Sequence, residues 1–285
     1  MDQELIDLYD AYTHGAIERR AFFDRLAKVA GGTTAAAALF AALRNDYAHA
    51  QTVAEDDARL ASETVAYGGP GTSGYLVRAK EGGKRGAVIV IHENRGLNAH
   101  IRDVTRRVAL EGYLALGVDL LAVSGGTPAD EDQAREAIGK LDAADTLAKL
   151  KSAVAFLAKH ELGNGRVGAV GFCWGGGTVN RLAAAGAGLH AGVAYYGRTL
   201  AVAEVPNLEA PLLLHYAGKD ERINATIPEF EQALKAAGKA YELHLYEGVN
   251  HAFNNDTSAA RYDEAAAKLA WSRTLAFFAT HLATR

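Results

Sequence analysis

From about residue 60 onward, short apolar runs alternate with longer amphipathic segments. The run Ala87–Ile91 is unbroken, which is typical of a strand buried on both faces of a parallel sheet. Further strands are predicted at 114–118, 166–171, 191–196, 211–216 and 241–246, and helices at 99–111, 130–160, 175–185, 226–237 and 259–282. This alternation predicts βαβ units and an α/β fold, with a mostly parallel sheet flanked by helices.

The beginning of this region has a different pattern. Segments 63–67 and 74–78 flank a Gly-Gly-Pro-Gly turn, which predicts a hairpin. No internal repeat or low-complexity linker interrupts the chain beyond it. Residues 61–285 are therefore predicted to form one catalytic domain.

Residues 1–60 are predicted to be a helical extension, with helices near 2–12, 18–30 and 33–45. Arg19-Arg20, the apolar run 29–43 and Ala48-His49-Ala50 also resemble a twin-arginine export signal. Charged residues before the run and Gly31-Gly32 within it favour a retained segment. The predicted location is cytoplasmic, with periplasmic export as the alternative. The chain has no run of about 20 strongly apolar residues, so no membrane span is predicted.

Candidate chemistry centres on Gly171-Phe172-Cys173-Trp174-Gly175, which contains the only cysteine. A strand precedes this pentapeptide and a helix follows it, as in a nucleophile elbow, which is usually built around serine. The glycines allow a strained turn and close packing of strand against helix. The alternative is a buried structural cysteine beside a glycine-rich turn.

A nucleophile at an elbow needs a base, and the base needs an orienting acid. Asp220 follows strand 211–216 and His251 follows strand 241–246, in the order nucleophile, acid, histidine that this fold uses. Both are expected at the carboxyl edge of the sheet, where open α/β sheets bind ligands. The other histidines, His14 among them, lack such a context and are predicted to be ordinary structural residues.

The segment after strand 87–92 adds further candidates. Glu93 is placed to tune or deprotonate the thiol, and the backbone N–H groups of Asn94 and Trp174 are predicted to form an oxyanion hole. His92-Glu93 is not followed by the spacing His-Glu-x-x-His, so neither a metal site nor a cofactor is predicted.

Composition narrows the classes of partner. The chain has 285 residues and a net charge of −4, which gives no indication of a polyanion-binding surface. A single cysteine excludes an intramolecular disulfide and fits a reducing compartment. The expected partner is a small molecule, with no nucleic acid or membrane partner; the oligomeric state is not predicted.

Over residues 62–283 the chain resembles the dienelactone hydrolases. The resemblance rests on the elbow, Asp220, the segment Asn250-His251-Ala252-Phe253, and Glu93 with the Gly96-Leu97-Asn98 that follows it. It implies an α/β-hydrolase fold and a Cys-His-Asp triad. It also implies that Glu93 contacts the resting thiol and takes its proton when substrate binds.

The chain departs from this family at two arginines that grip the substrate carboxylate. One is expected shortly after the segment that here reads Asp119-Leu120-Leu121, where no arginine follows, and the other at the position of Asn255. Arg95, Arg198 and Arg222, which all follow predicted strand ends, are candidate replacements.

Together these features predict a cysteine-dependent hydrolase of carboxylic esters or lactones that acts through an acyl-enzyme. One alternative is a binding protein of hydrolase fold without turnover. Another is a glutaminase-type amidotransferase, but the glutamate that it would carry two residues after the histidine is replaced by Phe253.

Overall fold

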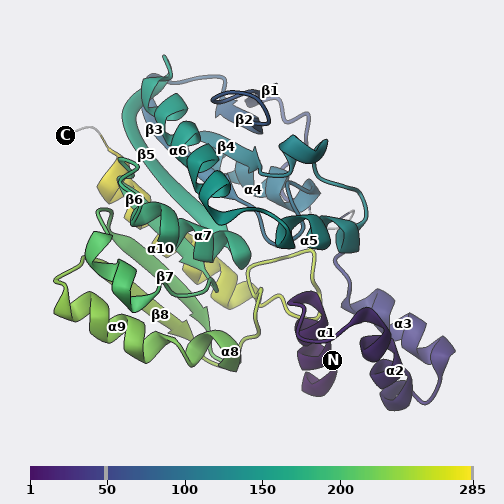
Figure 1. The fold of residues 1–285 in the computed structure, drawn as a ribbon. Coiled ribbons are helices and arrows are strands. Elements are labelled where there is room, and N and C mark those ends of the chain that lie inside the picture. Colours follow the sequence, from purple (N-terminus) through teal and green to yellow (C-terminus); the bar gives the residue numbers. More distant parts are fainter. Residues whose placement is uncertain (48–50, 284–285) are drawn as a thin grey trace.

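The computed structural model describes residues 1–47 and 51–283 of the chain. Its centre is an eight-stranded sheet in the order β1-β2-β4-β3-β5-β6-β7-β8 (Figure 1). The strands are β1 (Leu60–Val65), β2 (Ser73–Ala79), β3 (Arg85–Ile91), β4 (Leu114–Asp119), β5 (Gly163–Phe172), β6 (Ala191–Tyr195), β7 (Leu212–Ala217) and β8 (Tyr241–Tyr246). Strand β2 runs antiparallel to β1 and β4, and the remaining strands are parallel.

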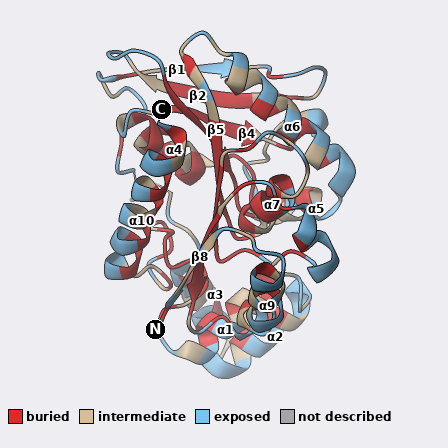
Figure 2. Ribbon diagram, turned by 90° about the vertical axis from the view of Figure 1, so that its left-hand side faces the viewer, coloured by how far each residue is buried: buried red, intermediate tan, exposed pale blue. Residues whose placement is uncertain are grey.

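Helices cover both faces of this sheet. One face carries α4 (Ala99–Leu110) and α10 (Glu264–Leu282), and the other carries α6 (Ala143–Lys159), α7 (Trp174–Ala183) and α9 (Ile227–Ala236). Strand β3 shows why both faces must be covered: Val88 and Val90 belong to the first apolar layer, whereas Ala87, Ile89 and Ile91 belong to the second. In Figure 2 the inner strands are buried, whereas the edge strand β1 and the outer sides of the helices are largely exposed. The α/β-hydrolase fold expected from the sequence is confirmed.

Several boundaries differ from the prediction for local reasons. The predicted helix 130–160 is two helices, α5 (Glu131–Gly139) and α6, because the Asp142 side chain caps a new helix by accepting from the Asp145 N–H. The last helix begins at Glu264 rather than near 259, where Asp263 caps it in the same way. Two short elements, the 3-10 helix η2 (Val202–Asn207) and helix α8 (Glu221–Asn224), were not predicted. A further 3-10 turn, η1 (Ala122–Ser124), follows β4.

The N-terminal residues form α1 (Gln3–Thr13), α2 (Arg19–Ala30) and α3 (Thr33–Leu43). They enclose an apolar cluster of their own, centred on Tyr9, Tyr12, Phe22 and Leu26. Residues 1–47 are called the N-terminal cap below. Among the described residues no single helix is long and apolar enough to cross a membrane; α2 and α3 together meet that test but are bent by 109°. Ala48-His49-Ala50, the end of the segment that resembles an export signal, lies outside the described residues.

The N-terminal cap lies near α5 and α8, beside the loops that follow the strands (Figure 1). Tyr12 donates its hydroxyl hydrogen bond to Asp132 of α5, at 2.6 Å. The Asn94 side chain, just after β3, donates to the Thr13 carbonyl at 2.8 Å. These contacts place the C-terminal end of α1 over the carboxyl edge of the sheet.

Candidate active site

Cys173 lies in a tight turn between β5 and α7, as the elbow pattern predicts. Its backbone has φ 53° and ψ −113°, a conformation rarely adopted by a residue with a side chain. A Cβ added to Gly171 would lie 2.2 Å from the Gly175 carbonyl oxygen, and one added to Gly175 would lie 2.4 Å from that of His92. Both positions therefore require glycine, because the neighbouring backbone lies too close to leave room for any side chain.

His251 and Asp220 meet at the same edge of the sheet. Asp220 follows β7 and His251 follows β8, in a turn whose next residue, Ala252, has φ 64°. His251 Nδ1 lies 2.5 Å from Asp220 Oδ2, and both side chains are buried. His251 Nε2 is buried too and has no hydrogen-bond partner within the described part of the chain.

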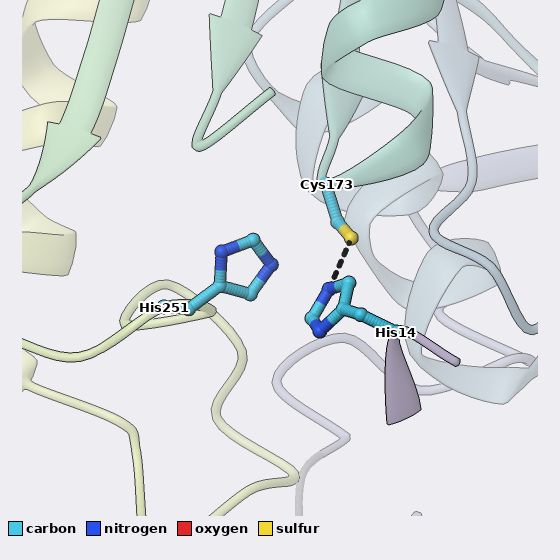
Figure 3. Close-up of side chains that lie close together, drawn as sticks. All are labelled: His14, Cys173 and His251. Carbon is cyan, nitrogen blue, oxygen red and sulfur yellow. Dashed lines mark hydrogen bonds between the residues drawn. The ribbon is translucent and has the colours of Figure 1, made fainter. Parts of the chain in front are cut away.

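The thiol's hydrogen-bond partner is a residue that sequence reasoning missed. His14, at the C-terminal end of α1, has its Nε2 atom 3.3 Å from Cys173 Sγ (Figure 3). Its ring also meets the His251 ring edge to face, with centroids 4.6 Å apart. No local signal could have identified His14, because 159 positions separate it from Cys173 and nothing around it resembles a motif.

Asp10 orients His14 much as Asp220 orients His251. His14 Nδ1 lies 2.8 Å from the Asp10 carbonyl oxygen and 3.3 Å from its Oδ2 atom. Each imidazole thus has its Nδ1 held by an aspartate, which leaves its Nε2 free to face the thiol. The ligand atoms of Cys173, His14 and His251 all lie within 4.8 Å of one another.

The charges of this cluster favour the thiolate. Burial alone would raise the pKa of Cys173, but His14 and His251 lower it to about 6. Conversely, burial opposes protonation of both histidines, yet the thiolate and the aspartates raise the pKa of His14 and hold that of His251 well above its usual value. The pKa of Asp220 is lowered against the effect of burial, chiefly by His251. With a pKa of about 6, Cys173 is mostly thiolate near neutral pH, and the pKa values of both histidines are shifted in the direction that favours their protonated forms.

Glu93 has a different partner from the one implied by the family resemblance. It is buried, and its Oε2 atom accepts a hydrogen bond from the Asn255 side chain at 2.9 Å. Asn255 stands where the family carries one of the missing arginines, and its side-chain Oδ1 atom in turn accepts from the Thr257 hydroxyl. In the described residues the hydrogen bond to Cys173 Sγ comes from His14, not from Glu93.

Asn94 and Trp174 both line the cavity around Cys173. The close approach of Gly175 to the His92 carbonyl brings the end of β3 against the elbow, which places Asn94 beside the first turn of α7. The rings of His92 and Trp174 stack with centroids 5.5 Å apart, which further fixes this junction. The role of the Asn94 and Trp174 backbone N–H groups as oxyanion donors stays a prediction.

The three candidate arginines lie in different surroundings. Arg198 and Arg222 line the cavity, and Arg222 lies 3.8 Å from Asp220. Arg95 is buried elsewhere: it pairs with Glu131 at 3.2 Å and donates to the Tyr9 hydroxyl at 3.3 Å, so it helps to hold the N-terminal cap.

The cavity above Cys173 has a volume of about 1320 Å³. One wall comes from the hydrolase domain and the opposite wall from the N-terminal cap, as its lining residues Thr13, His14, Thr178, Leu200 and Phe230 show. This volume exceeds the usual range for small-molecule sites, about 300–1,000 Å³. A substrate in it would touch both parts of the chain.

The sheet and its elbow define a protein of the α/β-hydrolase class. The sequence profile of the "Dienelactone hydrolase family" matches residues 72–282, so the chain belongs to this family. A second profile, described as "YqhI-like", matches residues 1–31, which include His14.

Individual relatives agree with this assignment. A Methylorubrum extorquens protein named "Putative carboxymethylenebutenolidase" is 34% identical over 219 residues, 72% of this chain and 75% of its own length. A Bradyrhizobium protein named "Probable 2-oxo-3-(5-oxofuran-2-ylidene)propanoate lactonase" is 32% identical over 244 residues, covering 78% of this chain and 98% of its own. The solved structure of a "Putative Dienelactone Hydrolase" from Klebsiella pneumoniae superposes with a TM-score of 0.71 at 33% identity, covering 77% of this chain and 98% of that one.

The close approach at the elbow gives the first testable prediction. Gly175→Ala should destabilise the protein by about 3 kcal/mol or more, because its Cβ would meet backbone atoms that cannot move aside. Gly139→Ala is the matched control, since a Cβ there meets nothing within 4 Å and alanine is the better helix former. Urea denaturation checks both variants, and equal stability of the two would contradict this account.

The second prediction concerns the charge state of Cys173. Its alkylation by iodoacetamide should rise with pH around a midpoint of about 6, because only the thiolate reacts. His14→Gln removes one positive neighbour and should move the midpoint upward, toward about 8.5. His160→Ala, at the end of α6, is the control and should leave the midpoint unchanged. An unshifted midpoint in His14→Gln would show that His14 does not stabilise the thiolate.

Proposed function

We propose that this protein hydrolyses carboxylic esters or lactones through Cys173, His251 and Asp220. The observation that carries the proposal is the buried His251–Asp220 pair, whose free Nε2 atom lies beside a thiol on a strained elbow. Relatives named as a butenolidase and a lactonase support the reaction class.

The proposed reaction proceeds in two halves. The Cys173 thiolate attacks the acyl carbon, and the N–H groups of Asn94 and Trp174 stabilise the oxyanion. The carbon–oxygen bond then breaks, and the leaving alkoxide takes a proton from His251. In the second half His251 removes a proton from water, which attacks the thioester and releases the acid and the thiolate. Asp220 keeps the imidazole oriented throughout.

His14 gives the resting enzyme a feature that the triad alone lacks. It holds the thiolate from the side of the N-terminal cap while His251 Nε2 remains unpaired. An acyl group that reaches Sγ displaces this contact, and the histidine then faces the bound substrate. We therefore expect His14 to maintain a reactive thiolate before substrate arrives, a role that the resemblance assigned to Glu93.

The two arginines with which the family binds a substrate carboxylate are absent, so any charge on the substrate must be bound by other residues. Arg198 lines the cavity, is exposed, and has no carboxylate partner within the described part of the chain. A free guanidinium in the same cavity as the nucleophile favours a substrate with an anionic group. We propose that Arg198 binds it, while Arg222 is engaged by Asp220.

The alternatives are less well supported. The place of an amidotransferase's glutamate is taken by Phe253, which is fully buried in the core. A binding protein without turnover has no need of an orienting aspartate for His251, yet Asp220 lies at 2.5 Å from it.

Loss of the nucleophile tests the proposal directly. Cys173→Ala should lower kcat on activated esters and lactones by at least about 10³-fold, while Asp220→Asn should retain part of the activity. Mass spectrometry of the wild type quenched during turnover should show one acyl group on Cys173. Undiminished hydrolysis by Cys173→Ala would refute the mechanism.

The role of Arg198 is tested by paired substrates. Arg198→Gln should raise KM about tenfold or more for an ester with a carboxylate group and leave KM for its neutral analogue unchanged, because one charge-assisted hydrogen bond is lost. Arg20→Gln, on an exposed position of α2, is the control. An equal effect on both substrates would assign Arg198 a structural role. Dienelactone itself should be a poor substrate, since both family arginines are missing.

A further inference from the structure

Three soft donor atoms converge at the carboxyl edge of the sheet. They are Cys173 Sγ, His14 Nε2 and His251 Nε2, all within 4.8 Å of one another (Figure 3). From this geometry we infer that the N-terminal cap and the hydrolase domain together form a binding site for a zinc-like divalent metal ion.

The donor set has the chemistry of zinc. Thiolate and imidazole ligands select zinc and related transition metals, whereas magnesium and calcium require oxygen ligands. Tetrahedral zinc, with bonds of about 2.3 Å to sulfur and about 2.0–2.1 Å to nitrogen, places its donors about 3.3–3.6 Å apart. His14 Nε2 is already 3.3 Å from Sγ, and His251 Nε2, within 4.8 Å of both atoms, needs only a small movement to join the same arrangement.

Both imidazoles are oriented in the manner of metal ligands. Histidine ligands usually donate their second N–H to a carboxylate or a carbonyl. Here Asp220 holds Nδ1 of His251 at 2.5 Å, and the Asp10 carbonyl holds Nδ1 of His14 at 2.8 Å. The remaining Nε2 atoms face the sulfur, and that of His251 is buried without a partner among the described residues.

The site has room for a fourth ligand. The same cavity of about 1320 Å³ is lined by all three residues, so water or an anion can complete the tetrahedron. Binding releases to solvent the protons that the two imidazoles carry on Nε2, since Cys173 is already a thiolate, and no other covalent bond changes.

A metal at this position has two consequences. It occupies the sulfur lone pair that the proposed reaction requires, so it inhibits hydrolysis reversibly; this consequence alone rests on the proposed function. It also links residue 14 to residues 173 and 251, so it fastens the N-terminal cap over the cavity.

The sequence could not reveal this donor set. The adjacent His92 and Glu93 do not form such a site: His92 Nδ1 lies 2.6 Å from the Glu93 carbonyl oxygen, and the His92 ring stacks on Trp174. The three donors lie far apart in the sequence and come from the end of a helix, an elbow and a loop.

Cobalt(II) provides a direct probe, because its bond to a thiolate absorbs in the near ultraviolet. Titration of the reduced full-length protein with Co²⁺ should produce this band with a stoichiometry of one, and Zn²⁺ should abolish it. Cys173→Ser should lack the band. His14→Gln and His14→Ala should bind at least tenfold more weakly, whereas His160→Ala should bind as the wild type does.

The outcomes separate the two proposals. Absence of the band at saturating Co²⁺, or equal affinity in the wild type and in both His14 variants with native circular dichroism, would overturn the metal site even if hydrolysis is observed. A band that depends on His14 supports the site even if no ester is hydrolysed. With an active substrate, Zn²⁺ but not Mg²⁺ should inhibit, and the inhibitory concentration should rise at least tenfold in His14→Gln.

Discussion

The close approach of backbones at the elbow is the constraint on which the rest of the site depends. Gly171, Gly175 and the His92 carbonyl lie too near one another to admit a side chain, so β5, α7 and the end of β3 form one rigid junction. This junction holds Cys173 in its left-handed conformation and presents its thiol above the sheet. Asn94 and Trp174 line the same cavity as the thiol. The strained backbone of Cys173 is tolerated because the contacts around it leave no room for another conformation.

The N-terminal cap takes part in the site through its charge interactions with the thiol. Burial by itself would keep the thiol protonated and the imidazoles neutral. The two aspartate–imidazole pairs, Asp220–His251 and Asp10–His14, reverse this preference and make the thiolate the resting form. The pairs come from opposite ends of the chain and approach the sulfur from two sides. Docking of α1 is consequently part of the site's chemistry as well as of the packing.

Sequence patterns predicted the fold well because its determinants are local. The unbroken apolar strands and the elbow glycines are visible in short windows, and Asp220 and His251 each directly follow a predicted strand; the structure brings these two side chains and Cys173 to one edge. Helix boundaries differ from the prediction where a single capping side chain, such as Asp142, sets the first residue of a helix. His14 could not be found, because its importance comes from the docking of one helix against distant loops. The partner of Glu93 was unpredictable for the same reason.

The arrangement separates the reaction from its specificity. The elbow and the His251–Asp220 pair belong to the domain that matches the dienelactone hydrolase family, whereas one wall of the cavity belongs to a segment that a different profile matches. At the position where the family carries an arginine, Asn255 donates a hydrogen bond to Glu93 instead. A substrate carboxylate therefore lacks one arginine ligand, and Glu93 is no longer a free acid beside the thiol. His14 supplies a cation at that thiol from the other side. The same end of α1 therefore contacts the thiol and lines the cavity in which a substrate would bind.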